Sequence, residues 1–251
     1  MLKVENISKY YGDKKVIDNI FLKIEKGKIT SFIGPNGAGK STFLMIISRL
    51  IDKSSGKVYI DGKKIESYKK IELSKKISIL KQSNFINLKL TVKELVSFGR
   101  FPYSQGRINS EDERAIDNAI NYMRLSDIKD KYLDELSGGQ RQRAFIAMVI
   151  AQETEYIFLD EPLNNLDMSN CVQMMKVLRK LCDELKKTIV IVMHDINFAS
   201  CYSDYIVAFK DGKIVKEGLV DEIINENVLR EIYDMDFDVQ NVSGKKISIY
   251  Y

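Results

Sequence analysis

The stretch from residue 34 to residue 42 reads Gly-Pro-Asn-Gly-Ala-Gly-Lys-Ser-Thr and constrains the rest of the chain. It fits the pattern of a glycine, four variable residues, Gly-Lys and a hydroxyl residue, which is typical of a phosphate-binding loop. The glycines permit backbone conformations that turn several N–H groups toward one anion. Lys40 adds a positive charge for the β- and γ-phosphates, and the Ser41 hydroxyl is suited to Mg²⁺.

The segments on both sides of this loop support that interpretation. The apolar segment Ile29–Ile33 runs into the loop and predicts a strand. The segment Thr42–Leu50 follows it and predicts a helix, whose N-terminus favours a phosphate. A glycine-rich stretch without such flanks is usually only a turn, so we interpret this one as phosphate-binding from its context.

Composition and charge exclude several other classes of protein. The chain has 251 residues, 45% hydrophobic and 29% charged, and its net charge of +4 comes from scattered lysines. This pattern indicates a solvated surface rather than a nucleic-acid-binding arm. The longest apolar run, Ala144–Ala151, is far shorter than the roughly 18 residues that span a bilayer. We therefore expect a chain that does not cross a membrane but is able to act at one through a partner.

The three cysteines, Cys171, Cys182 and Cys201, show no Cys-x-x-Cys spacing. Such spacing is typical of metal and redox sites, and its absence favours thiols that pack in a reduced, cytosolic setting. We therefore expect neither a disulfide nor a metal site from these residues.

Residues 1–82 show short β patterns separated by turns. Apolar residues alternate with polar ones from Leu2 to Ile7 and from Ile20 to Ile24, and Val58–Ile60 and Ile77–Leu80 are further strand candidates. Tyr11 follows the first of these patterns. Its ring is able to stack on a purine, and the alternative is an ordinary residue on the surface of a sheet.

From about residue 83 to residue 153 the pattern becomes mostly helical. Thr91-x-x-Glu94 and Ser110-x-x-Glu113 are capping boxes that open helices. Between them lies an aromatic loop, Phe98–Tyr103, and Ser137-Gly-Gly-Gln140 leads into the apolar helix Ala144–Ala151. We expect a helical segment inserted into an α/β core.

Strand patterns return in the last third of the chain. Tyr156–Asp160 ends in two carboxylates, Asp160 and Glu161, and Thr188–Met193 ends at His194. Ligands of open α/β sheets bind at the carboxyl ends of buried parallel strands, which favours a phosphate contact for His194 over a packed histidine. The remaining patterns predict a helix over 168–186, a hairpin over 205–215, a helix over 221–234 and a terminal hairpin turning at 243–245.

In this order the motifs resemble the ATP-binding subunits of ABC transporters over essentially the full chain, and Leu136–Gln140 matches the signature of that family. The resemblance implies an α/β fold: a P-loop NTPase (RecA-like) core with an N-terminal antiparallel β subdomain and an inserted α-helical subdomain. Within a single domain of residues 1–251, the core and β subdomain take residues 1–82 and 154–235. The helical signature subdomain takes residues 83–153, and a C-terminal hairpin takes residues 236–251.

The resemblance also implies ATP and Mg²⁺ as cofactors, and it assigns roles to single residues. The nucleotide-binding residues are Tyr11, Gly34, Pro35, Asn36, Gly37, Ala38, Gly39, Lys40, Ser41, Thr42, Ser137, Gly138, Gly139 and Gln140. The residues at the metal are Ser41, Gln82 and Asp160, and those implied in catalysis are Glu161, His194 and Gln82. The segment Asn164–Asp167 takes the place of the family's D-loop and departs from its common Ser-Ala-Leu-Asp form by two asparagines.

Finer markers resemble the ATPases of bacterial ferric-siderophore importers, namely Phe98–Tyr103, the Glu161–Met168 segment and the short C-terminal tail. Importers of vitamin B12 and haem lie close to that group and stay open as alternatives. The implied protein is peripheral, at the cytoplasmic face of the cell membrane. Its implied partners are integral-membrane permease subunits, a second copy in an ATP-sandwich dimer and, indirectly, an extracytoplasmic substrate-binding protein, but no nucleic acid.

Two other kinds of ABC protein compete with this interpretation. The ATPase of an iron–sulfur assembly complex has similar length and the same motifs, so it stays open as an alternative. DNA-repair and ribosome-acting ABC ATPases need a long coiled coil or two cassettes, and this chain shows neither pattern.

Overall fold

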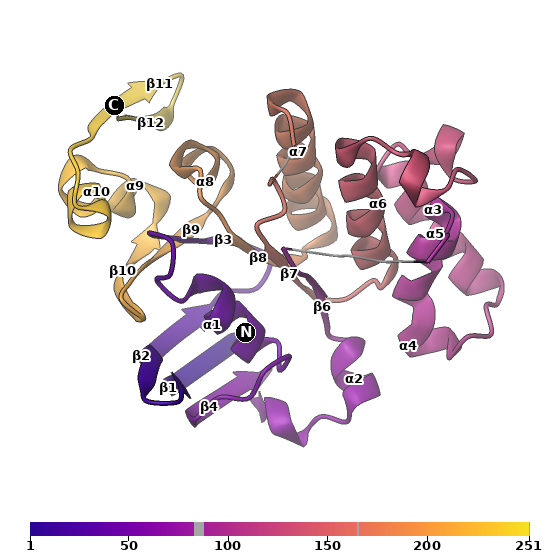
Figure 1. The fold of residues 1–251 in the computed structure, drawn as a ribbon, viewed down its shortest axis with the longest axis horizontal. Coiled ribbons are helices and arrows are strands. Elements are labelled where there is room, and N and C mark those ends of the chain that lie inside the picture. The colour runs from indigo at the N-terminus through magenta and orange to yellow at the C-terminus, as the bar shows by residue number, and fades with distance from the viewer. Residues whose placement is uncertain (83–87, 165, 251) are drawn as a thin grey trace.

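A six-stranded sheet forms the centre of the molecule in the computed structural model, which describes residues 1–82, 88–164 and 166–250. Its order is β10-β9-β3-β8-β7-β6, with the β9–β10 pair antiparallel and the other neighbours parallel (Figure 1). The strands are β3 (Ile29–Ile33), β6 (Ile77–Leu80), β7 (Tyr156–Asp160), β8 (Thr188–Val192), β9 (Tyr205–Lys210) and β10 (Lys213–Leu219). Every residue of β3, β7 and β8 is buried, as expected for parallel strands that are covered on both faces.

A smaller antiparallel sheet packs against the central one, with helix α1 (Lys40–Ile47) between them (Figure 1). Its order is β2-β1-β4-β5, with β1 (Leu2–Tyr11), β2 (Lys14–Ile24), β4 (Ser55–Ile60) and β5 (Lys63–Lys64). Phe43 of α1 belongs to a core cluster that also contains Val4 of β1 and Phe158 of β7. The helix that follows the phosphate loop is therefore fixed from two sides.

Most of the segment from Val92 to Ala151 is helical, as the sequence predicted. It contains α3 (Val92–Ser97), η2 (Phe98–Arg100), α4 (Phe101–Ser104), α5 (Ser110–Tyr122), η3 (Ser126–Ile128), η4 (Leu133–Glu135) and α6 (Gly138–Ala151). Helices α3, α5 and α6 pack against one another. Residues 83–87 of the predicted insertion lie outside the described residues, so its bounds and the division of the chain into subdomains stay predictions.

The remaining elements lie along the chain on either side of this segment. The short η1 (Ile65–Ser67) and α2 (Lys70–Ser74) precede β6, and the later ones are α7 (Met168–Leu185), α8 (Ile196–Tyr202), α9 (Val220–Ile223), α10 (Glu226–Tyr233), β11 (Asp238–Val242) and β12 (Lys245–Ile249). Met174 and Leu178 of α7 join a second core cluster with Ile116 of α5 and Ile191 of β8. The β11–β12 hairpin is anchored on α8, where Asn197 donates a hydrogen bond to the Ser248 carbonyl at 3.1 Å.

Several local predictions are confirmed. Strands β3 and β6 have the predicted bounds, and β7 and β8 lie where the two later apolar runs were found. The turn residues Asp211 and Gly212, and likewise Ser243 and Gly244, have positive φ angles, which two-residue hairpin turns require. The cysteines form no disulfide, and Cys171 and Cys182 are buried.

Other local predictions are wrong in the bounds, the cap or the type of an element. The predicted helix over 221–234 is two helices, because Asn225 caps a new helix by accepting a hydrogen bond from the Val228 N–H. The helix after the phosphate loop spans 40–47 rather than 42–50. The predicted capping box at Ser110 lies one residue earlier, where Asn109 and Asp112 form it. The aromatic stretch Phe98–Tyr103 is not a loop but two short helical turns, and helix α8 had no predicted counterpart.

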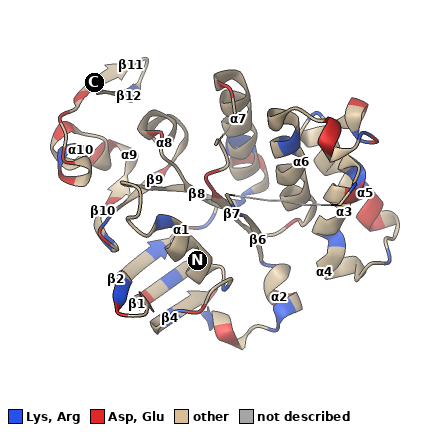
Figure 2. Ribbon diagram, viewed as in Figure 1, with Lys and Arg blue, Asp and Glu red and all other residues tan. Residues whose placement is uncertain are grey.

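No helix among the described residues is both long enough and apolar enough to cross a membrane. Lysine and arginine lie interspersed with aspartate and glutamate over the ribbon, as the scattered charges of the sequence predicted (Figure 2).

A buried ion pair holds the helical segment together, and no sequence pattern predicted it. The side chains of Arg100 and Asp112 are only 2% and 1% exposed, and Arg100 Nε donates to Asp112 Oδ1 at 2.9 Å. Arg100 also donates to the Ala151 carbonyl and to Glu153. Removal of one partner would leave a buried charge without compensation, so we expect the loss of either residue to destabilise the helical segment.

We predict that Phe43→Ala strongly destabilises the fold. The rings of Phe32, Phe43 and Phe209 lie with their centroids 5.2–5.7 Å apart, and all three are fully buried. Truncation of such a ring costs about 3–5 kcal/mol of unfolding free energy, measured by denaturant titration. The control is Phe21→Ala, because Phe21 is 61% exposed and should change stability by less than about 0.5 kcal/mol. Equal losses for both variants would contradict this account of the core.

Candidate functional site

The phosphate loop lies between the end of β3 and the start of α1, against the backbone of β9. Gly34 has a φ of 136°, and a Cβ at this position would lie 2.0 Å from the Phe209 carbonyl oxygen, so no other residue fits here without a shift. The Gly34 N–H donates a hydrogen bond to the hydroxyl of Tyr233 on α10 at 3.0 Å. The first turn of the loop is therefore fixed by contacts from two distant parts of the chain.

The second end of the loop is held by the β1–β2 hairpin. Gly39 caps α1 in a left-handed conformation with a φ of 97°, and a Cβ there would lie 2.7 Å from Ile17 Cδ1 and 3.0 Å from the Val16 carbonyl oxygen. Tyr11 belongs to the same hairpin and pairs with Lys14. Tyr11 is 52% exposed, so part of the residue is open to solvent or to a planar ligand, and Lys9 Nζ lies over its ring, 4.9 Å from the centroid.

Lys40 is a buried cation at the centre of the loop. Its Nζ donates to the carbonyl oxygens of Gly34 at 2.7 Å and Pro35 at 2.9 Å. Burial lowers the pKa of Lys40, and the nearby carboxylates of Glu161 and Asp160 oppose that shift. The ammonium group thus lies where a negatively charged ligand would be strongly attracted.

Ser41 and Asp160 meet at the place that the sequence predicted for a metal. Ser41 Oγ donates to Asp160 Oδ1 at 2.7 Å, across the gap between α1 and the end of β7. Burial raises the pKa of Asp160, while the Ser41 hydroxyl, His194 and Lys40 oppose the shift. A hydroxyl and a buried carboxylate at this distance fit the oxygen ligands that Mg²⁺ prefers, and a cation would offset the cost of burying the charge.

The carboxylate of Glu161 is held by side chains from three segments. His194 Nε2 lies 2.6 Å from Glu161 Oε1, and Gln82 Nε2 donates to Oε2 at 2.5 Å. Asn164 Nδ2 also donates to Oε2 at 2.5 Å. The structure therefore brings together all three residues predicted for catalysis. His194 and Gln82 both contact Glu161, whose side chain is only 9% exposed.

Two residues make contacts in this site that the sequence did not predict, Asn164 and Tyr233. Asn164 was noted only as a departure from the family's D-loop, although an amide three residues after a carboxylate is a local signal that could have revealed this contact. Tyr233 left no signal, because it is 199 residues from Gly34 along the chain and the fold alone joins them. Burial raises the pKa of Tyr233 to about 12, which keeps its hydroxyl neutral.

The signature stretch forms the beginning of α6. Ser137 caps the helix, its hydroxyl accepting from the Gln140 N–H at 3.3 Å and its N–H donating to Gln140 Oε1 at 3.0 Å. Within residues 1–82, 88–164 and 166–250, no hydrogen bond or ion pair joins Ser137–Gln140 to the phosphate loop. The structure thus brings the strand-tip residues together with the loop but does not connect the signature to them.

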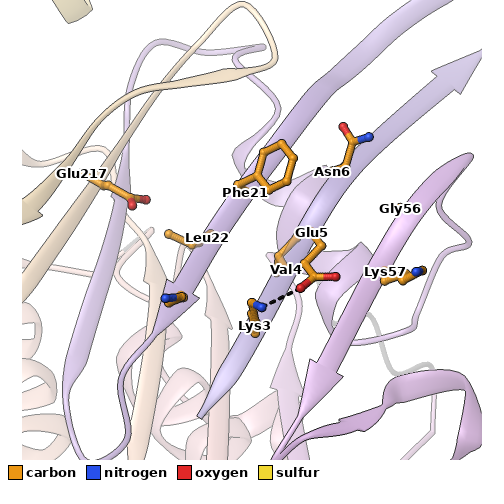
Figure 3. Close-up of a pocket in the computed structure, with 10 residues that line it drawn as sticks. Lys3, Val4, Glu5, Asn6, Phe21, Leu22, Gly56, Lys57 and Glu217 are labelled. Atoms are coloured by element: carbon orange, nitrogen blue, oxygen red, sulfur yellow. Dashed lines mark ion pairs between the residues drawn. The ribbon is translucent and has the colours of Figure 1, made fainter.

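Of two cavities, the smaller is lined by residues predicted for the site and the larger is not. One of about 240 Å³ lies at the ends of β7 and β8 and is lined by Glu161, Asn164 and His194, among others. A larger one of about 690 Å³ lies on the antiparallel sheet. Figure 3 shows Phe21 on β2 and the Lys3–Glu5 ion pair on the neighbouring strand β1. None of the predicted site residues lines that larger cavity.

Comparisons with known proteins agree on one family. The family model described as "ABC transporter" matches residues 17–164. The "Petrobactin import ATP-binding protein YclP" of Bacillus subtilis (strain 168) is 63% identical over 251 residues, which is 100% of each chain. The "Petrobactin import ATP-binding protein FatE" of Bacillus anthracis is 47% identical over 250 residues, again 100% of each.

A solved structure supports the same assignment. The ATP-binding cassette MJ0796, described as a dimer in a post-hydrolysis state bound to ADP and Pi, is 34% identical with a TM-score of 0.78. The match covers 88% of this chain and 99% of that one. The phosphate loop, the strand-tip carboxylates and the start of α6 lie within the part of the chain that the family model matches. The chain belongs to the ABC transporter family, as one of its ATP-binding, ATP-hydrolysing subunits.

Proposed function

We propose that this chain hydrolyses ATP to drive the import of a ferric siderophore of the petrobactin type through a membrane permease. The observation that carries the catalytic part is the meeting of Ser41, Asp160, Glu161 and His194 beside the phosphate loop. The identity of 63% to a petrobactin import ATP-binding protein supports the cargo class. On this proposal the chain works at the cytoplasmic face of the membrane and contacts the substrate-binding protein only through the permease.

In the proposed mechanism the chain positions phosphate groups and a water molecule. Lys40 and the loop N–H groups bind phosphate oxygens, and Ser41 and Asp160 would hold Mg²⁺, with Gln82 as a further ligand. The metal would supply charge that stabilises the transferring phosphoryl group. Glu161 orients the attacking water and accepts its proton, and His194 holds the γ-phosphate and the Glu161 carboxylate in place. Most of the rate gain on this account comes from positioning and electrostatics.

Gln82 and Glu161 contact each other directly, and this contact has a consequence for the cycle. Gln82 Nε2 donates to the same Glu161 oxygen that accepts from Asn164. If Gln82 were to hold a metal, this hydrogen bond would have to break, and Glu161 would then be free to bind water.

The signature residues Ser137–Gln140 are proposed to complete the site of a second copy. They have no hydrogen bond to the phosphate loop of their own chain among the described residues, and α6 presents its N-terminus with a neutral cap. N–H groups at a helix N-terminus favour an anion. In a head-to-tail pair, the N-terminus of α6 in one copy would face the γ-phosphate bound by the other copy.

Aromatic side chains on η2 and α4 are the proposed contact with the permease. Phe98, Phe101 and Tyr103 are 47%, 63% and 36% exposed. The buried Arg100 fixes the turn that carries them, and the Tyr103 hydroxyl donates to the Gln152 carbonyl at 3.1 Å. Exposed aromatic side chains on a rigid turn are typical of a protein interface rather than of a solvated surface.

We predict different outcomes for two substitutions in the site. Lys40→Ala should weaken nucleotide binding and abolish turnover, because a buried cation that contacts the phosphates is lost. His194→Ala should leave binding near normal but lower the turnover number at least tenfold, because Glu161 loses one of its three side-chain partners. Nucleotide titration and steady-state phosphate release on both purified variants measure this difference. If His194→Ala binds normally and turns over within twofold of the unmodified protein, His194 is only structural.

A second prediction concerns the permease contact. Phe101→Ser with Tyr103→Ser should reduce assembly with the permease, because the exposed aromatic area that would be buried is removed. The melting temperature of the isolated subunit should stay near normal. Phe21→Ser, another exposed aromatic position on a different sheet, is the matched control and should assemble normally. A large loss of melting temperature without an assembly defect would show that the aromatic residues serve only to pack the helical segment.

The third prediction tests the site shared between two copies. Glu161→Gln should trap an ATP-bound dimer, because the amide preserves the shape, stops water activation and removes a negative charge beside the phosphates. Addition of Gly138→Asp should abolish that dimer, because a carboxylate would meet the partner's γ-phosphate. Light scattering with ATP measures dimer formation, and nucleotide titration checks each monomer. A double variant that still dimerises, or one that no longer binds ATP as a monomer, would contradict the shared site.

A further inference from the structure

A basic pocket lies between the helical segment and α7, on elements that the proposed ATPase site does not use. Its volume is about 340 Å³. The lining residues come from the end of α5 and the turn after it, from α6 and from α7, and they include Tyr122, Arg124, Arg143, Lys176 and Lys180. Figures 1 and 2 show α6 and α7 next to each other, with basic positions on both. None of the nucleotide, metal or catalytic residues predicted from the sequence is among the lining residues.

The pocket has an excess of positive charge. Arg124, Arg143, Lys176 and Lys180 line it, with no acidic residue among the lining side chains. In the described part of the chain, the one carboxylate that pairs with any of these four is Glu184, 3.7 Å from Lys180. Cations gathered in this way repel one another, so an anion bound between them would be stabilised.

Two polar atoms in the pocket wall are buried without a partner. Arg143 Nε and the Tyr122 hydroxyl are inaccessible to solvent and make no hydrogen bond with another described residue. A buried donor without a partner is unfavourable, and such atoms in natural structures commonly mark a missing ion, water or ligand. The guanidinium group of Arg143 is suited to a carboxylate or phosphate.

Besides the polar side chains of Asn121 and Gln173, the rest of the wall is apolar. Met123, Met174 and Val177 lie between the cationic side chains, and Lys180 Nζ lies 5.3 Å from the centroid of the Tyr122 ring. Burial raises the pKa of Tyr122 to about 12, so its hydroxyl stays a donor at neutral pH. Methionine side chains adapt to irregular apolar ligands. The pocket therefore offers charge for an anionic group and an apolar surface for the body that carries it.

We propose that this pocket binds a small organic anion, a phosphate or carboxylate group on an apolar or aromatic body. The cationic side chains of Arg124, Arg143, Lys176 and Lys180 provide the positive charge that binds the anionic group. The methionine and valine side chains contact the apolar part. Such a ligand would touch α5, α6 and α7 at once, and so would join the helical segment to the helix that follows the D-loop. This proposal does not depend on the identity of the imported cargo.

Isothermal titration calorimetry with phenyl phosphate tests the proposal, with ADP and Mg²⁺ present at saturation so that the phosphate loop is filled. We expect one binding event per chain, with an affinity that falls as salt is added. Inorganic phosphate should bind more weakly than phenyl phosphate, because it lacks the apolar part. Arg124→Ala with Lys176→Ala should weaken phenyl phosphate binding at least tenfold, and both positions are exposed enough for the variant to fold.

The matched control is Lys64→Ala with Lys216→Ala, which removes two exposed lysines that lie outside the pocket and leaves its lining unchanged. It should change the affinity by less than twofold. Absence of binding at millimolar phenyl phosphate, or equal losses in the pocket variant and the control, would overturn the proposal. Phosphate binding as tight as phenyl phosphate binding would overturn the apolar part of the ligand class.

Discussion

The contact between Gly34 and the backbone of β9 is the constraint on which the site depends. A side chain at this position would meet the Phe209 carbonyl, so the chain leaving β3 must turn at a glycine. The turn places Lys40 at the start of α1, and Phe43, one helical turn later, packs against Phe32 and Phe209 of the same two strands. The aromatic core and the loop therefore support each other, because the strand that restricts Gly34 also buries the helix.

In this arrangement, burial shifts the pKa values of the charged groups in the site. Lys40 and Asp160 both lose solvent, which lowers the pKa of the lysine and raises that of the aspartate. Each group partly offsets the other's shift, and Ser41 gives Asp160 a hydrogen bond. A phosphate and a divalent cation would complete the neutralisation. The site is therefore arranged for ligands of both signs, which agrees with an ATP-binding subunit.

The sequence predicted the fold well wherever its signal was local. Strands such as β6, with apolar residues ended by polar ones, have the predicted bounds, and the Asp-Gly and Ser-Gly turns lie where they were expected. The helix after β10 was predicted too long, because Asn225 was not interpreted as a cap. The aromatic stretch Phe98–Tyr103 was predicted as a loop because it contains Gly and Pro, but it forms two short helical turns.

For the site, the sequence supplied candidate residues but not their contacts. Strand-end positions and the family resemblance implied roles for Glu161 and His194, but the shared hydrogen bonds of Gln82 and Asn164 to Glu161 depend on where three segments meet. The Tyr233 bond to Gly34 and the Arg100–Asp112 pair join residues that no periodic pattern relates. The unpartnered Arg143 was likewise invisible, since a sequence does not reveal which cations lack a partner.

The central claim is that one nucleotide site is built from two copies of this chain. The most direct measurement is an experimental structure of the Glu161→Gln protein with ATP and Mg²⁺. The account predicts ATP between the Lys40 loop of one copy and the Ser137–Gln140 helix start of the other, with Gln82 released from residue 161. A structure in which ATP contacts residues of one chain alone, with the signature stretch facing solvent, would contradict it.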